Sequence, residues 1–265
     1  MRALRFGVLF AVLVLVAGGV VWFVLSTRKP SQPACVATTA DGASSYRLTP
    51  AQAQNAGTIA GVGLRLGMPS HAVTVALATA LQESKLYNLT GGDRDSAGLF
   101  QQRPSQGWGT LEDVTDPVYA AGAFYNRLRQ QKNWAQLTVT EAAQQVQRSG
   151  APDAYAQWEP EARVVAGALT GETSATFTCQ HLTVAPATAN IVDVANDELG
   201  TAVLSGRHDA ARGWALSSWL VANAVRFGLD KVTFDGRTWT AADGNWSQPG
   251  TADGMLSLHQ VPAAS

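Results

Sequence analysis

The sequence predicts an α+β fold with an N-terminal transmembrane helix, then a mainly α-helical domain and a small C-terminal α+β domain. Three observations predict it: an unbroken apolar run near the amino terminus, apolar side chains at helical spacing through the middle of the chain, and mixed helical and alternating patterns after it. We expect an anchor over residues 1–29, a linker over 30–47, the helical domain over 48–180 and the α+β domain over 181–265.

The bulk composition excludes one class of partner. The chain has 265 residues and a formal net charge of −1. Nucleic-acid binding normally needs a basic surface, so we expect no nucleic-acid partner. The length suits one or two modest domains.

The apolar run over residues 6–25 predicts a membrane span. At a rise of ~1.5 Å per residue it reaches roughly 30 Å, the thickness of a bilayer core. The run ends in Trp22-Phe23-Val24-Leu25 without a small-residue cleavage site, which favours an uncleaved signal-anchor over a cleaved signal peptide. The basic residues that flank it slightly favour an inside amino terminus. We therefore expect a single-pass protein of the cell membrane whose bulk is extracytoplasmic.

The two cysteines agree with that location. Cys35 and Cys179 bracket the predicted helical domain, which favours a disulfide formed in an oxidising compartment over two separate buried thiols. The bond would close a loop of 143 residues, worth up to about 5 kcal/mol in the chain-entropy model.

Local patterns predict the helices and strands. Thr49, Pro50 and Gln52 form a capping box with proline at the first helical position, and Gly67 ends that helix. Ser70 is expected to cap the next helix, over 71–86. Further helices are expected over 117–130, 140–148, 158–169, 188–199 and 214–227, and strands over 230–235, 237–240 and 254–261, with Asp235-Gly236 as a hairpin turn.

Glu83 lies near the end of the second predicted helix, at the border of its apolar face. At 100° per residue it comes beside Ala76. Partial loss of hydration and the helix macrodipole both favour the protonated carboxyl group there, which suits a general acid. The alternative is an ordinary solvated glutamate at a helix end.

A second motif follows twelve residues later, over residues 95–104, with the sequence DSAGLFQQRP. Glutamate-serine at a helix end, followed by Ser-x-Gly-Leu-Phe-Gln-x-x-Pro, resembles the soluble lytic transglycosylase and goose-type lysozyme group of the lysozyme-like superfamily. Their pattern is Glu-Ser, a variable loop and Gly-Leu-Met-Gln. The resemblance covers roughly residues 50–170. The sequences over residues 92–110 and 144–159 are in addition similar to those of membrane-anchored proteins of high-GC Gram-positive bacteria.

This resemblance implies a glycosidase that cleaves the β-1,4 MurNAc–GlcNAc bond of peptidoglycan, with Glu83 as catalytic acid/base. The Gly-Leu-x-Gln turn lines the sugar cleft in that group, which carries over to Gly98, Leu99 and Gln101. We expect the serines of the two motifs and a nearby tryptophan to contact the glycan as well, namely Ser84, Ser96 and Trp108. The tryptophan offers a stacking surface for a sugar ring, or else fills the core.

One feature of the transglycosylases is missing. They usually carry a later Ala-Tyr-Asn-Ala-Gly segment whose tyrosine approaches the glutamate, but the corresponding residues 143–149 read AQQVQRS. Tyr125 and Tyr155 are the candidates to replace it.

The cleavage chemistry has two alternatives. Hydrolysis needs a second carboxylate that places a water or acts as nucleophile, whereas a lytic transglycosylase needs one acid/base, because the muramyl 6-hydroxyl attacks its own anomeric carbon. Asp93 and Asp95 are candidates to position water, although aspartates also commonly close turns. We favour the single-acid route. The alternative to an enzyme is a non-catalytic peptidoglycan-binding or scaffold membrane protein with a retained sugar cleft.

The C-terminal segment distantly resembles a small domain related to zinc D-Ala-D-Ala peptidases. Its final strand carries only His259 where those peptidases keep a His-x-His pair, and a catalytic zinc needs three spaced ligands. We therefore expect no metal and no cofactor. The expected partners are peptidoglycan glycan strands and the membrane.

Overall fold

The computed structural model describes residues 32–248 and 250–263. The expected anchor over 1–29, with its span over 6–25, lies outside the described residues. Within residues 32–248 and 250–263, no helix has the length and apolar character that crossing a membrane requires. The chain from Pro33 onward forms one compact unit of helices and two small sheets, which confirms the α+β class.

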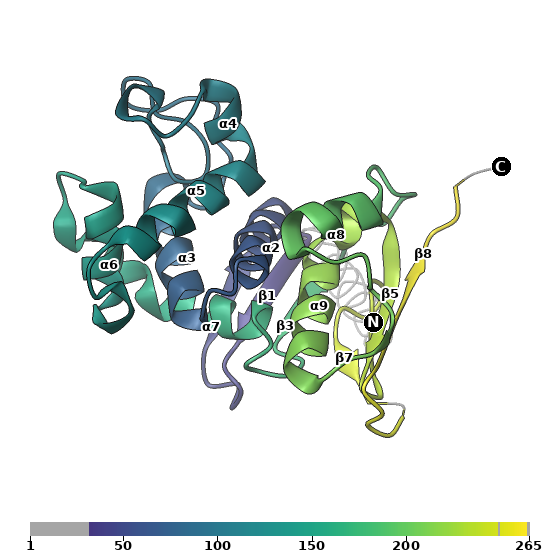
Figure 1. Ribbon diagram of the computed structural model, residues 1–265. Helices are drawn as coiled ribbons and strands as arrows, with labels where there is room; N and C mark the ends of the chain where they lie inside the picture. The colour runs from purple at the N-terminus through teal and green to yellow at the C-terminus, as the bar shows by residue number, and fades with distance from the viewer. Residues whose placement is uncertain (1–31, 249, 264–265) are drawn as a thin grey trace, which may run out of the picture. The chain divides into compact units, whose positions relative to one another are not determined.

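Helix α2 lies in the middle of this unit (Figure 1). It packs against α3 and α5 on one side and against α8 and α9 on the other. The helices of the first part are α2 (Pro50–Arg65), α3 (Ser70–Ser84), α4 (Leu111–Thr115), α5 (Pro117–Gln130), α6 (Val139–Gln147) and α7 (Glu159–Leu169). Short 3-10 helices cover Pro104–Gln106, Trp134–Gln136 and Pro152–Trp158.

Several helix ends follow the sequence prediction. Thr49 and Gln52 form the predicted capping box at the start of α2, and α5 has the predicted bounds because Asp116 accepts two backbone N–H groups at its start. The beginning of α3 differs: Ser70 is its first helical residue, and Pro69 takes the cap position without a side-chain hydrogen bond. Ser70 therefore does not cap this helix.

A three-stranded antiparallel sheet contains the two ends of the helical part. Its strands are β1 (Ala34–Thr38), β2 (Ser45–Leu48) and β3 (Phe177–Gln180), in the order β2-β1-β3. This differs from the linker expected over 30–47. Both strands in that segment are short, and the partner β3 lies far along the chain, so local patterning gives no indication of the pairing.

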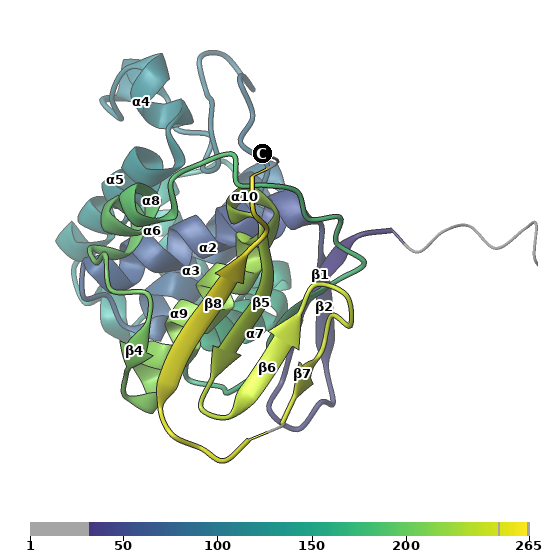
Figure 2. The ribbon, with the colours of Figure 1, turned by 90° about the vertical axis from the view of Figure 1, so that its right-hand side faces the viewer.

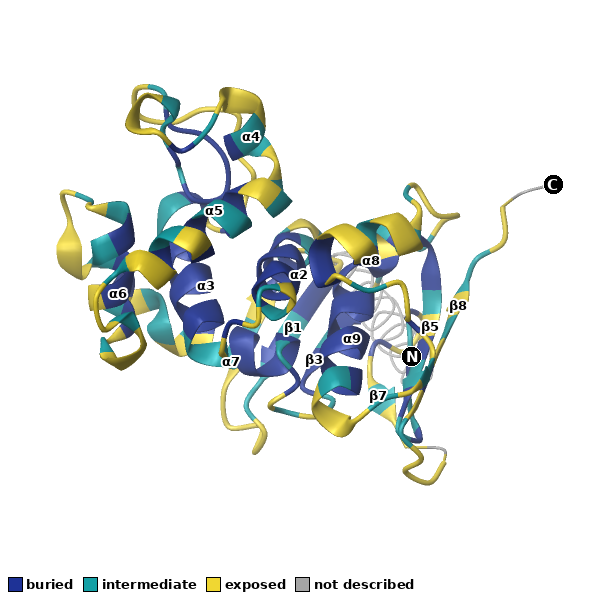
Figure 3. Ribbon diagram, in the orientation of Figure 1, coloured by how far each residue is buried: buried dark blue, intermediate teal, exposed yellow. Residues whose placement is uncertain are grey.

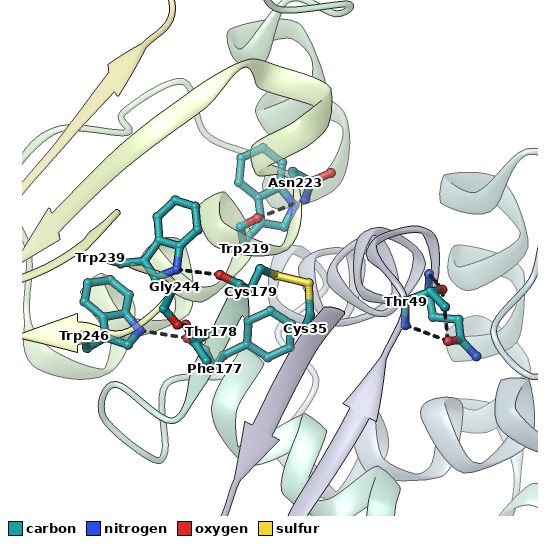
Figure 4. The surroundings of a disulfide bond; sticks show 11 residues. Cys35, Thr49, Phe177, Thr178, Cys179, Trp219, Asn223, Trp239, Gly244 and Trp246 are labelled. Atoms are coloured by element: carbon teal, nitrogen blue, oxygen red, sulfur yellow. Dashed lines mark hydrogen bonds between the residues drawn. A yellow bond between two sulfur atoms is a disulfide. The ribbon is translucent and has the colours of Figure 1, made fainter. Parts of the chain in front are cut away.

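The predicted disulfide is confirmed. Cys35 faces Cys179 across the β1–β3 ladder, both side chains are fully buried, and their sulfur atoms are bonded. Figure 4 shows the bond beside the indole of Trp239, whose Nε1 donates to the Cys179 carbonyl at 3.2 Å. The bond thus ties the first described strand to the end of the helical part.

The C-terminal part is a five-stranded sheet backed by helices (Figure 2). Its strand order is β4-β8-β5-β6-β7, and α9 packs against β5. The elements are α8 (Ile191–Leu199), α9 (Ala210–Ala222), α10 (Ala224–Phe227), β4 (Gly206–Arg207), β5 (Leu229–Phe234), β6 (Arg237–Thr240), β7 (Trp246–Ser247) and β8 (Met255–Gln260). Asp235 and Gly236 both have positive φ angles between β5 and β6, as a two-residue hairpin turn requires.

The core continues across the boundary expected at residue 180. Helices α2 and α9 are buried along most of their length (Figure 3), and they meet at Gly57. A Cβ atom there would lie 3.3 Å from Asn223 Nδ2 and 3.4 Å from Ala222 Cβ. Trp246 Nε1 also donates to the Phe177 carbonyl at 2.8 Å. The helical part and the C-terminal part therefore support one another.

Replacing Cys35 and Cys179 together by alanine is expected to lower the free energy of unfolding by about 2–5 kcal/mol, because the bond constrains a long loop of the unfolded chain. Alanine suits both positions because they are buried. Urea unfolding of the full-length protein, with and without reducing agent, measures the effect. Reductant should destabilise the wild type and leave the double variant unchanged; equal behaviour of the two proteins contradicts the assignment.

Candidate active site

A cleft of about 620 Å³ is formed by the end of α3, the loop that follows it and the end of α6. Its lining residues are Glu83, Asp93, Arg94, Ser96, Gln101, Arg103, Gln106, Trp108, Gln147, Arg148, Ser149 and Gly150. Both sequence motifs contribute to this set. The structure thus brings the predicted acid and the predicted glycan-binding turn to the same cleft.

Glu83 is half-buried and has a defined partner. The Tyr155 hydroxyl donates to Glu83 Oε1 at 2.8 Å. Burial raises the pKa of Tyr155, so its phenol stays protonated and keeps its donor. Of the two tyrosines that could replace the missing one, Tyr155 is therefore the one beside Glu83.

Tyr125, the other candidate, lies in the core. Its side chain is fully buried, and its hydroxyl donates to the Ile59 carbonyl at 2.9 Å. A Cβ atom added at Gly63 would lie 2.8 Å from this hydroxyl, which shows how closely α2 and α5 approach. Tyr125 holds these helices together and does not line the cleft.

The end of α3 is fixed by the turn that follows it. Lys85 and Leu86 both have positive φ angles, and their N–H groups donate to the Leu81 and Ala80 carbonyls, a pattern that satisfies the last carbonyls of a helix. Gln82 adds a lateral contact, because its Oε1 accepts from Trp158 Nε1 at 2.8 Å. Trp158 and Tyr155 belong to the same 3-10 helix, which therefore braces the last turn of α3 on the side of Glu83.

Ser84 joins the two motifs directly. Its Oγ is buried and donates to the Leu99 carbonyl at 2.7 Å. Leu99 is fully buried, and Gly98 has a φ of 77° where a Cβ atom would lie 1.9 Å from the Val114 carbonyl oxygen. Ser84, Gly98 and Leu99, all expected to bind glycan, thus lie beneath the cleft and support it rather than line it.

Gln101 and Ser96 line the cleft and also stabilise its turn. Gln101 has a φ of 47°, its Oε1 accepts from Ser96 Oγ at 3.0 Å, and its Nε2 donates to the Gly98 carbonyl at 3.2 Å. From α6, Gln147 Nε2 donates to the Phe100 carbonyl at 2.8 Å. These hydrogen bonds hold the turn in place within the free protein, so little reorganisation is needed on binding.

The two aspartates have different environments. Asp95 accepts from the Ser105 N–H group and from Arg103 Nε, both at 2.8 Å. These donors hold the pKa of Asp95 well below its usual range, so Asp95 closes the loop as an ionised group. Asp93 is at the cleft rim, with 93% of its side chain exposed. Only Asp93 of this pair lines the cleft.

Trp108 has features of both alternatives expected from the sequence, a stacking surface for a sugar ring and a core-filling side chain. It borders the cleft, but only 6% of its surface is exposed. The guanidinium group of Arg127 lies 3.6 Å from its ring centroid, so one face of the indole is already covered. Little of the indole is therefore left to contact a sugar.

One wall of the cleft was not predicted from the sequence. It is formed by the last residue of α6 and the three residues after it, Gln147, Arg148, Ser149 and Gly150. The sequence signal that could have indicated this wall is a group of polar residues directly after the apolar positions of an amphipathic helix. Arg94, Arg103 and Gln106 were missed as well, since nothing local marks a loop residue as facing a cleft.

The histidine of the final strand, His259, pairs with an aspartate of the neighbouring strand β5. His259 Nδ1 lies 2.6 Å from Asp230 Oδ1. Across the described ranges, no group of three or more His, Cys, Asp or Glu side chains could hold a metal ion.

Comparison with protein-family models and with curated proteins gives no match for this chain.

Replacing Asp95 by asparagine is expected to lower stability in a pH-dependent way. Because the folded-state pKa lies below the ordinary value of 3.8, the ionised carboxylate contributes stability above about pH 4, and this contribution is lost as the pH falls further. Thermal unfolding of both proteins between pH 7 and pH 2 should show a gap in Tm that narrows below pH 4. Asp93→Asn, at an exposed position, is the matched control; a gap that does not change with pH contradicts the account.

Proposed function

We propose that this protein is a membrane-tethered glycosidase that cleaves the β-1,4 MurNAc–GlcNAc bond of peptidoglycan, with Glu83 as the single acid/base. The observation that carries the proposal is the 2.8 Å hydrogen bond from Tyr155 to Glu83 at the wall of a cleft. The cleft also contains the second motif, which Ser84 connects to the end of α3. The resemblance of both motifs to the lytic transglycosylases supplies the reaction.

The proposed first step is protonation of the leaving group. Glu83 donates its proton to the oxygen that joins C1 of MurNAc to C4 of GlcNAc, and the C1–O bond breaks with its electron pair going to that oxygen. The Tyr155 hydroxyl then stabilises the carboxylate that forms. Because this hydrogen bond exists in the free protein, the carboxyl group is oriented before the substrate binds.

In the proposed second step the carboxylate acts as a base. Glu83 accepts the proton of the muramyl 6-hydroxyl as its oxygen attacks C1, which gives a 1,6-anhydro ring and restores the acid. This route needs no second carboxylate. It is supported by Asp95, whose oxygens are engaged by Arg103 and Ser105, and by the high exposure of Asp93.

We further propose that the protein acts outside the cytoplasm. The disulfide between Cys35 and Cys179 supports this location, since such bonds persist in oxidising compartments. The apolar run over residues 6–25 would then anchor the protein in the membrane that faces the peptidoglycan layer.

Glu83→Gln is expected to reduce cleavage by about 10²–10⁴-fold, the usual contribution of a general acid/base. The assay incubates full-length protein with purified peptidoglycan and resolves the muropeptides by mass. Anhydro ends from the wild type support transglycosylation, and reducing ends that disappear in Asp93→Asn would point to a hydrolase instead. Binding without product from the wild type would favour a non-catalytic scaffold.

Tyr155→Phe is expected to reduce kcat by about 10–100-fold, because it removes a hydrogen bond to a charged group worth about 1.5–3 kcal/mol. KM should change little, since the hydroxyl contacts Glu83 rather than the glycan. Tyr119→Phe, on the exposed face of α5, is the matched control. Unchanged kcat in Tyr155→Phe, with normal folding by circular dichroism, would show that the contact has no part in the reaction.

A further inference from the structure

A smaller pocket of about 260 Å³ adjoins the cleft, and the two share Gln106 and Arg148. Apart from Val146, two arginines and four glutamines line it: Arg127, Arg148, Gln106, Gln130, Gln131 and Gln145. No acidic side chain belongs to this lining. The pocket is thus a concave, positively charged surface directly beside the proposed catalytic cleft.

The position of Arg127 is fixed by its own contacts. Its guanidinium group stacks on Trp108 at 3.6 Å, and its Nη2 donates to the Gln106 and Gly107 carbonyls at 3.2 Å each. These bonds orient the group without neutralising its charge. Arg127 is therefore a preorganised cation rather than a mobile surface side chain.

The positive charges of the two arginines repel one another. Partial burial lowers the pKa of Arg127, and the positive charge of Arg148 lowers it further. Throughout the part of the chain that the structure describes, neither guanidinium group forms an ion pair with a carboxylate. Two unpaired like charges at one pocket create a positive potential that a bound anion would relieve.

We propose that this pocket binds a carboxylate of the peptide carried by the glycan strand in the Glu83 cleft. The inference rests on the proposed function and names the part of the substrate that sets specificity. Guanidinium groups match carboxylates in geometry and charge, and the glutamine amides offer donors and acceptors to peptide groups. The protein then selects glycan that bears acidic peptides over bare glycan of the same length.

Binding measurements on the full-length protein with Glu83→Gln test this, since turnover is removed. The probes are fluorescent glycan strands of one length in three forms: with free-acid peptides, with amidated peptides, and with the peptides removed by an amidase. The free-acid form is expected to bind about tenfold more tightly than either of the others, and added salt should reduce this difference.

Two pocket variants and one control make the result specific. Arg148→Gln removes one charge, and Gln145→Glu places a carboxylate inside the pocket. Each is expected to bring the affinity ratio close to one. Because Arg148 also lines the Glu83 cleft and Gln145 does not, only Gln145→Glu is expected to leave bare glycan within twofold of its original affinity. Arg163→Gln, an exposed arginine of α7 paired with Glu159, should leave the ratio unchanged. Arg127 is retained because it supports Trp108 and the loop.

Equal affinity of the Glu83→Gln protein for all three strands overturns the proposal. An affinity ratio that stays unchanged when Arg148→Gln is added overturns it as well. These readouts are separate from catalysis: a wild type that yields no muropeptide product refutes the glycosidase without changing the affinity ratios. Failure to bind any strand overturns both the proposed function and the pocket assignment.

Discussion

The hydroxyl of Tyr155 donates to Glu83 Oε1, and the neighbouring Ser84 donates to the Leu99 carbonyl. These two hydrogen bonds tie the last turn of α3 to two separate segments that follow it in the chain. The first fixes the carboxyl group relative to the 3-10 helix over Pro152–Trp158, and the second fixes the helix relative to the turn of the second motif. The geometry of the cleft depends on both.

The rest of the fold maintains this arrangement at a distance. Helix α2 packs on α3 and α5 with one side and on α9 with the other. The C-terminal part therefore supports the helical part on the side of α2 that faces away from α3 and α5. The β1–β3 pairing and its disulfide close the helical part into a loop. Any piece of this protein made for experiment must therefore begin before Ala34, because a start at the first helix would discard β1 and half of the disulfide.

Sequence reasoning succeeded where the determining interactions are local. The capping box of Thr49 and Gln52 and the Asp235-Gly236 hairpin turn involve residues within a few positions of one another. It failed for the β1–β3 pairing, because both strands are short and lie more than a hundred residues apart. It also failed for the local β1–β2 pairing, whose strands are short. The pairing of the cysteines in β1 and β3 was predicted only because Cys35 and Cys179 are the two cysteines of the chain.

The candidate site shows the same difference between features set by local interactions and features set by long-range contacts. The motifs identified Glu83 and the turn at Gly98, but they did not separate residues that face the cleft from residues that support it. Which of Tyr125 and Tyr155 reaches Glu83 depends on how two helices are turned about their axes, which no local pattern reports. The unpaired charges of Arg127 and Arg148 likewise become visible only when the fold brings α5 and α6 together.

The proposed proton route through Glu83 predicts which oxygen atom enters the product, and this prediction offers the most direct test. Purified peptidoglycan would be cleaved by the full-length protein in 18O-labelled water, and the new chain ends analysed by mass. The account predicts 1,6-anhydro ends without the label, because the attacking oxygen comes from the sugar itself. Incorporation of 18O at new reducing ends would contradict the single-acid route, and uncleaved strands would contradict a catalytic role for Glu83.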